Sequence, residues 1–131
     1  MKLVYPAIFY PFPEGEGYTV EVPDLPGCVS EGRDLAEAID MGTDAASGWI
    51  LGELEDGNDI PKASRPANIT PEENGIVSML VLDMDAYAEK YGENSIRKNI
   101  TIPAYMDTYL KKHHISLSQV VQDAVSGIMN S

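Results

Sequence analysis

The sequence lacks the features that mark several large classes of protein. It has a single cysteine, Cys28, which excludes an internal disulfide framework and fits a reducing cytosol. Its apolar runs are too short to span a membrane, and Met1 leads directly into a strand pattern in place of a signal peptide. It contains neither a glycine-rich phosphate loop nor a G-x-S-x-G nucleophile motif. We therefore expect a cytoplasmic protein that does not associate with membranes, and these motifs give no support for an enzyme.

Positive charge is also scarce, and it is unevenly distributed. The 131 residues include 9 Lys and Arg against 21 Asp and Glu, a net charge of −12. Residues 1–75 contain four basic and fifteen acidic residues (−11), whereas residues 95–131 contain four basic and two acidic ones (+2). Acidity alone is typical of a surface that keeps a protein in solution, but the asymmetry indicates two different partners. The tail can meet phosphates, and the front would be attracted to a basic protein.

The front of the chain has the pattern of a small α+β layer. The expected elements are strands at 3–10, 18–22 and 27–30, a long helix after Asp34, a strand at 76–82 and a short helix at 85–91. Pro6 requires an edge or a bulge in the first strand. Asp34 with Glu37 three residues later predicts the helix start, and Gly42 on the apolar stripe predicts close packing against the sheet. An exposed connection at 55–75 precedes the apolar run 76–82, which predicts a strand covered on both faces.

The tail has the pattern of one strand followed by two helices. Alternation across residues 95–103 predicts a strand with Arg97, Asn99 and Thr101 on its free face. A lone strand is unstable, so it should pair with the same strand of a second copy, as a two-stranded ribbon that fits a DNA major groove. Pro103 suits a first helical position before a helix to about Lys112. After the His113-His114-Ile115 turn, a Ser116–Gln119 capping box opens a helix whose apolar stripe needs a partner surface: Leu117, Val120, Val121, Ala124, Val125 and Ile128.

These motifs resemble two known families. IRKNITIP leading into YMDTYLKKHHISLSQVVQDAV is similar to a ribbon-helix-helix DNA-binding domain. Residues 5–10, the run VPDLPGC at 22–28 and S-E-G-x-D-x-x-E-A at 30–38 resemble the front domain of HicB antitoxins. The resemblance implies an α+β protein: a truncated ribonuclease-H-like domain at 1–92, with antiparallel strands and one long helix, then a ribbon-helix-helix dimerisation module at 93–131. Gly92-Glu93-Asn94 would be the hinge.

The resemblance also implies a function. A HicB-like chain would be the antitoxin of a type II toxin–antitoxin pair, would bind and neutralise a HicA-like mRNA-cleaving toxin, and would repress its own operon as a homodimer or a higher even oligomer. On operator DNA, Arg97, Asn99 and Thr101 would face base edges, because Arg and Asn can bond bidentately to guanine and adenine. Lys98 would reach phosphate or cap the ribbon. Ser116 and Ser118 open the second tail helix, whose N–H groups would anchor a phosphate.

Several alternatives stay open. The polar residues at 97, 99 and 101 could form a solvated strand edge, or the tail could read DNA with a helix-turn-helix. The chain could also buffer a partner protein without binding DNA, or regulate transcription without a toxin partner. A metal-dependent nuclease would need converging carboxylates. Residues 3–10 contain none, and Asp24, Asp83 and Asp85 fit turn and cap positions better. Adjacent His113 and His114 cannot converge on one ion without further ligands. We predict no catalytic residue, metal or cofactor.

Overall fold

The chain divides into two compact units, Lys2–Glu93 and Asn94–Ser131. The computed structural model describes residues 1–92 and 96–130. Glu93 and Asn94 of the predicted hinge, and Ser95 at the start of the predicted ribbon strand, lie outside the described residues.

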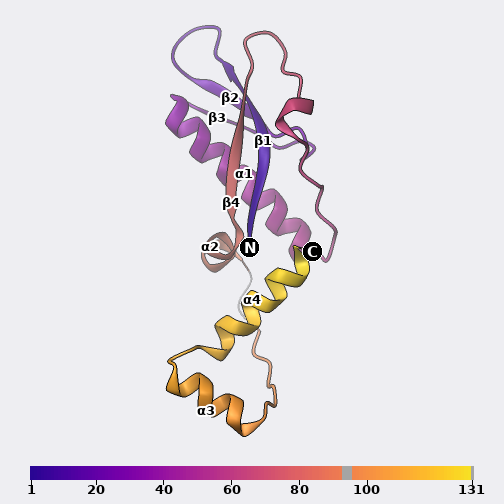
Figure 1. The fold of residues 1–131 in the computed structure, drawn as a ribbon. Helices are drawn as coiled ribbons and strands as arrows, with labels where there is room; N and C mark the ends of the chain where they lie inside the picture. The colour runs from indigo at the N-terminus through magenta and orange to yellow at the C-terminus, as the bar shows by residue number, and fades with distance from the viewer. Residues whose placement is uncertain (93–95, 131) are drawn as a thin grey trace. The chain divides into compact units, whose positions relative to one another are not determined.

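The first unit is an antiparallel sheet with one long helix against it (Figure 1). Its strands lie in the order β3-β2-β1-β4, with β1 at Lys2–Pro11, β2 at Tyr18–Glu21, β3 at Val29–Gly32 and β4 at Ile76–Asp83. All four predicted strands are therefore present, although the third begins two residues later than expected. The reason is a turn at Gly27, where φ is +80° and the Cys28 N–H donates to the Leu25 carbonyl at 2.9 Å.

β1 is an inner strand of the sheet, but at Pro6 it is paired on one side only, so this residue lies at a local edge as predicted. The β1–β4 ladder extends from Lys2 to Phe9 and pairs Pro6 with Met79. The β1–β2 ladder, by contrast, begins only at Ile8. A missing N–H is tolerated here because β1 has a single neighbour at this level.

The long helix α1, Leu35–Glu55, packs one face on the sheet. Two glycines permit the contact. At Gly42, a Cβ atom would lie 3.0 Å from the side chain of Val20, which confirms the predicted close packing. At Gly32, a Cβ atom would lie 2.2 Å from the backbone nitrogen of Ala38, so β3 and the start of α1 touch through their main chains.

Strand β4 is covered on one face only, which corrects the expectation that both faces are covered, and it lies at the edge of the sheet. Leu80 and Leu82 are buried on the α1 side. Met79 and Val81 point to the opposite face and are exposed. A run of apolar residues cannot distinguish a central strand from an edge strand with an apolar open face, because both have the same composition.

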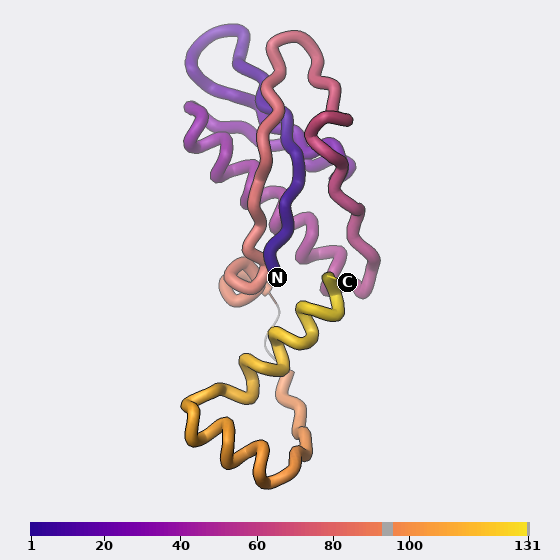
Figure 2. Tube along the Cα trace, in the orientation of Figure 1, coloured from indigo at the N-terminus to yellow at the C-terminus, as the bar shows by residue number. Residues whose placement is uncertain are grey.

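The connection between α1 and β4 runs back along the sheet, beside β1 (Figure 2). Near one end of β1, the Tyr5 hydroxyl donates to the Pro61 carbonyl. Near the other end, the Glu72 N–H donates to the Tyr10 hydroxyl at 3.3 Å. The connection includes a 3-10 turn, η1, at Pro66–Asn68. It is thus tied to the fold, although most of its side chains are exposed as predicted.

Helix α2, Met84–Tyr91, follows β4 directly, and the Asp83 carboxylate accepts from the Ala86 N–H at its start. The second unit contains α3 at Ala104–Lys112 and α4 at Leu117–Met129, joined by the turn at His113 and His114. These bounds confirm the predicted helices. Pro103 is the N-cap of α3, whereas the sequence predicted it at the first helical position, which Ala104 occupies.

Candidate functional site

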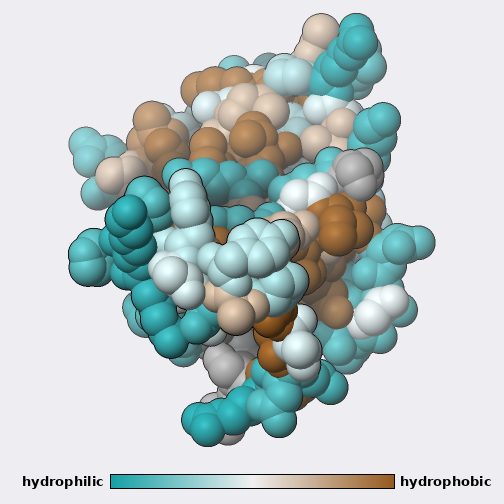
Figure 3. Space-filling view, turned by 60° about the horizontal axis from the view of Figure 1, so that its bottom comes forward, coloured by the Kyte–Doolittle hydropathy of each residue, from teal (hydrophilic) through white to brown (hydrophobic). Residues whose placement is uncertain are grey.

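The second unit has no buried residue between positions 96 and 130, the range described for it. Its apolar side chains are exposed instead, and hydrophobic residues lie at the surface between hydrophilic ones in the space-filling view (Figure 3). On α4 the exposed apolar residues are Val120, Val121, Val125, Ile128 and Met129. A helix pair gains most of its stability by burying such a stripe, so the single unit lacks the core that would hold it together.

An apolar groove lies between α3 and α4. It encloses about 420 Å³ and is lined by Ile102, Tyr105, Met106, Tyr109, Leu110, Leu117 and Val120. The lining is almost entirely carbon, with no charged group. An exposed apolar surface of this kind marks an interaction site more often than a solvated one.

A second pocket, of about 310 Å³, contains some of the residues predicted to bind DNA. Arg97, Lys98 and Ser118 line it together with Ile96, Ile100, Leu117, Val121 and Gln122. Asn99 and Thr101 are exposed but do not line this pocket. Two cationic side chains and a hydroxyl near the start of a helix are suitable for contacting a phosphate. The sequence pattern had not indicated that Arg97 and Gln122, from different elements, share one pocket.

Only half of the predicted capping box is present at the start of α4. The Ser116 hydroxyl accepts from the Gln119 N–H at 3.3 Å, as expected. The Gln119 side chain does not return to Ser116; its amide donates to the Asp123 carboxylate one turn later, at 2.9 Å. The negative charge of the carboxylate strengthens this hydrogen bond. Ser116 therefore serves as the cap, and its hydroxyl is already engaged.

Residues 96–102 form no strand in the single chain. The predicted alternation of buried apolar and exposed polar side chains is seen only in part. Ile102 is half-buried, but Ile96 and Ile100 are 78% and 53% exposed. A strand needs a hydrogen-bonded neighbour, and the described part of the chain supplies none to this segment. The ribbon prediction therefore depends on a second copy and stays a prediction.

Two of the three carboxylates considered for metal binding, Asp24 and Asp83, have structural roles. Asp24 accepts from both the N–H and the hydroxyl of Ser64, at 2.8 and 2.6 Å, and so fastens the connection to the turn at 22–28. Asp83 caps α2. Among the residues that the structure describes, no three His, Cys, Asp or Glu side chains form a cluster that could hold a metal ion. The Asp24–Ser64 pairing, across 40 residues, has no sequence signature.

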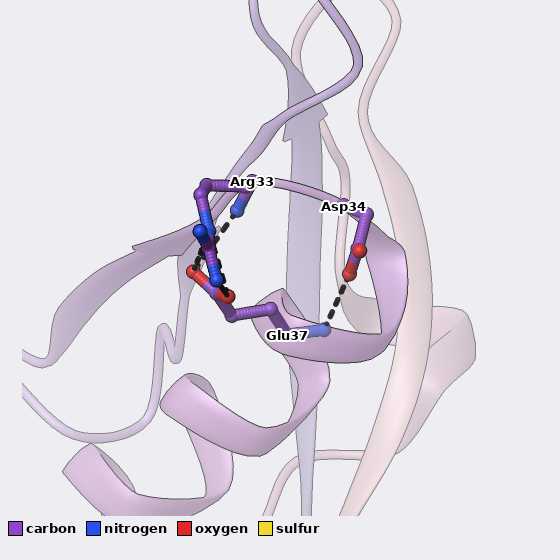
Figure 4. Close-up of polar contacts among 3 residues, drawn as sticks. All are labelled: Arg33, Asp34 and Glu37. Atoms are coloured by element: carbon purple, nitrogen blue, oxygen red, sulfur yellow. Dashed lines mark hydrogen bonds and ion pairs between the residues drawn. The ribbon is translucent and has the colours of Figure 1, made fainter.

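A close ion pair lies at the start of α1, between Arg33 and Glu37 (Figure 4). The Asp34 carboxylate accepts from the Glu37 N–H at 2.8 Å and confirms the predicted cap. Glu37 turns back to the guanidinium of Arg33, 2.8 Å away, and this hydrogen bond lowers the pKa of the Glu37 carboxyl. Both side chains are on the surface, so this pair fixes geometry at the helix start more than it adds stability.

Burial changes the acidity of two core groups. It raises the pKa of the Cys28 thiol, which favours the thiol over the nucleophilic thiolate. It also raises the pKa of Tyr5, with a smaller contribution from the negative charge of Asp24. Cys28 is a free, buried cysteine beside the turn at Gly27.

Solved chains with a similar fold come from toxin–antitoxin complexes. A toxin–antitoxin complex from Streptococcus pneumoniae contains a chain that matches 97% of this protein over 99% of its own length, with a TM-score of 0.64 and 22% identity. A HicA3 and HicB3 toxin–antitoxin complex contains a chain that covers 62% of this protein over 99% of its own length, with a TM-score of 0.51 and 22% identity. At these identities the likeness concerns the fold.

Sequence relatives define the family. An uncharacterised 14.9 kDa protein from the rep-hol intergenic region of Haemophilus phage HP1 is 33% identical over 105 residues, which cover 75% of this chain and 76% of the relative. Residues 5–125 match the model of the HicB-like antitoxins of bacterial toxin–antitoxin systems. The chain belongs to this HicB-like antitoxin family. No helix within the described residues is long and apolar enough to cross a membrane.

Proposed function

We propose that this antitoxin binds and neutralises a HicA-like mRNA-cleaving toxin with its first unit, and that two copies of its second unit bind operator DNA and repress its own operon. The observation that carries the proposal is that none of the described residues of the second unit is buried, and that their apolar stripe and groove call for another copy. A module of this size rarely folds alone, and dimerisation is one of the few ways to complete its core.

The charge of the first unit supports the toxin partner. Residues 1–92 contain five basic and eighteen acidic residues, a net charge of −13. An enzyme that cleaves RNA needs a basic surface, so the two proteins would attract each other over long range. The similar chain in the HicA3 and HicB3 complex supports the choice of a HicA-like partner.

The second unit would meet DNA through the segment before α3. When two copies pair, residues 96–102 gain the hydrogen-bonded neighbour that one copy lacks, and the ribbon would present Arg97, Asn99 and Thr101 to base edges. Lys98 would contact phosphate, and Ser118 with the N–H groups at the start of α4 would anchor another. Ser116 would contribute mainly as the cap that orients those N–H groups. The protein would act in the cytoplasm, where both partners are found.

The test is to co-purify the protein with the product of its neighbouring gene, and then to titrate labelled upstream DNA at about 50 and about 200 mM salt. We expect a stable toxin complex and DNA binding that weakens steeply with salt. A toxin complex without DNA binding would leave a protein that only buffers its partner. DNA binding without a toxin complex would leave a regulator that has no toxin.

A further inference from the structure

We infer that the outer edge of β4 is the docking site for the toxin, which adds an extended strand to the sheet. This inference rests on the proposed function, because it names the surface through which that partner would bind. Its basis is the coincidence of an open strand edge, an apolar face beside it, and acidic residues at both ends.

The edge itself is open and lacks protection. Among the described residues, β4 forms its ladder with β1 alone, so the main-chain groups on its other side have no strand partner. Protein sheets usually shield such an edge with Lys, Pro or a bulge, or by keeping it short. The eight residues of β4 contain none of these, and residues 76–82 have no charge at all. The opposite edge, β3, has four residues and includes Glu31.

The sheet face beside this edge is apolar and faces away from α1. Residues directly opposite each other in an antiparallel pair point to the same face, and Val81 is opposite Val4. Both are exposed, and so is Met79 two positions along the strand. Leu80, by contrast, packs under α1 near Gly42. An added strand would extend both the main-chain ladder and this apolar surface, which is the usual chemistry of strand addition.

Charge at the two ends of β4 decides between possible occupants. Glu72 and Glu73 precede the strand, and Asp83 and Asp85 lie at its end and just beyond. If two copies paired antiparallel through β4, the start of each strand would meet the end of the other, and these carboxylates would repel. A partner strand with apolar residues at its centre and Lys or Arg on both sides would instead be attracted at both ends.

The experiment compares two matched substitutions in the full chain. Val81→Lys places a cation on the β4 edge, where Val81 is 55% exposed. Val29→Lys is the control, because Val29 is 57% exposed on the same sheet face at the other edge, and the net charge is the same. Toxin affinity of each variant and of the wild type is measured by calorimetry, with circular dichroism to verify folding. We expect Val81→Lys to weaken binding about tenfold or more and Val29→Lys to change it less than about twofold.

Hydrogen exchange supplies a second measurement that does not depend on any substitution. Strand addition should slow amide exchange in residues 76–83 when the toxin binds, and leave residues 29–32 unchanged. Equal toxin affinity of Val81→Lys and wild type, or unchanged exchange in β4, would overturn the inference and leave the proposed function intact. If Val81→Lys altered only the oligomeric state, the edge would belong to a second copy, which also overturns it. If the wild type bound no toxin, both proposals would fail.

Discussion

At the residue scale, the start of α1 depends on the absence of a side chain at Gly32. The backbone of Ala38 occupies the place where a Cβ atom would project, at 2.2 Å, and main chain cannot move aside as a flexible side chain can. Gly52 in the same helix is the opposite case, since a Cβ atom there would meet nothing within 4 Å.

This contrast gives a matched pair of substitutions. Gly32→Ala should lower the free energy of unfolding by about 3 kcal/mol, because overpacking forces β3 and α1 apart. Gly52→Ala should raise it by about 0.5 kcal/mol, because alanine has the higher helix propensity. Urea unfolding followed by circular dichroism measures both. Equal stability of the two variants would contradict the close approach at Gly32.

Tyr5 gives a prediction about pH. Its pKa is raised by burial, so the fold requires the neutral phenol, and its contribution to stability is present below about pH 10 and lost as the pH rises through the raised pKa. Tyr5→Phe removes the hydrogen bond to the Pro61 carbonyl and should cost about 1 kcal/mol near neutral pH. It should also reduce the loss of stability between about pH 8 and about pH 11. Urea unfolding at both values tests this, and an identical loss in both proteins would show that another group is responsible.

At the element scale, the segment 96–102 and helix α4 are two candidate readers of DNA. Arg97 and Gln122 line one pocket, so position alone does not separate them. Gln119 of α4 is less suited to contact a base, because its side-chain amide already donates to Asp123. It would have to break this hydrogen bond to reach DNA. This favours the segment before α3 as the reader over a helix-turn-helix arrangement.

Substitution of each reader tests the choice. Arg97→Ala should cost about 1–3 kcal/mol of specific operator binding, because a bidentate base contact is lost. Gln119→Ala should change it by less than about 0.5 kcal/mol. Fluorescence anisotropy with operator and scrambled DNA measures the specific part. The reverse order of effects would identify α4 as the reading element, and no effect from either would leave residues 97, 99 and 101 as a solvated edge.

At the scale of the whole molecule, the two units differ in whether one copy of the chain supplies their hydrophobic core. The first unit has a core that includes Phe9, Leu25, Ile50 and Leu82, and it is complete without a second copy. The second unit has no such core in its described residues. Function should therefore be separable, with toxin binding independent of pairing and DNA binding dependent on it.

A charge in the apolar groove tests this separation. Val120→Asp should prevent pairing, because two copies would bury a carboxylate without a partner. We expect operator affinity to fall at least tenfold and toxin affinity to stay within about twofold. Light scattering with size-exclusion chromatography reports the oligomeric state. Asn130→Asp, at the exposed C-cap of α4, is a control that changes the charge equally. Retained pairing in Val120→Asp would mean that the groove is not the dimer surface.

Sequence reasoning located the elements well and their surroundings less well. Caps and periodicity are local, so Asp34, Ser116 and the bounds of α3 could be predicted from neighbouring residues. The inner position of β1, the open face of β4 and the Asp24–Ser64 bond could not, because each depends on which distant segment lies alongside. The partner of the Glu37 side chain was also not predicted. The spacing indicated that Glu37 takes part in the helix cap, whereas its carboxylate accepts from the guanidinium of Arg33.

The sequence by itself determined the family, the order of the elements and the division of charge between front and tail. Those properties follow from residue type and from spacings of a few positions, which tertiary contacts do not alter. Only the tertiary structure decided that β4 is an edge with an apolar open face, and that no described residue of the second unit is buried in one copy. The physical reason is that burial and strand pairing each depend on two segments in contact. The residues of one segment do not specify which other segment lies against it.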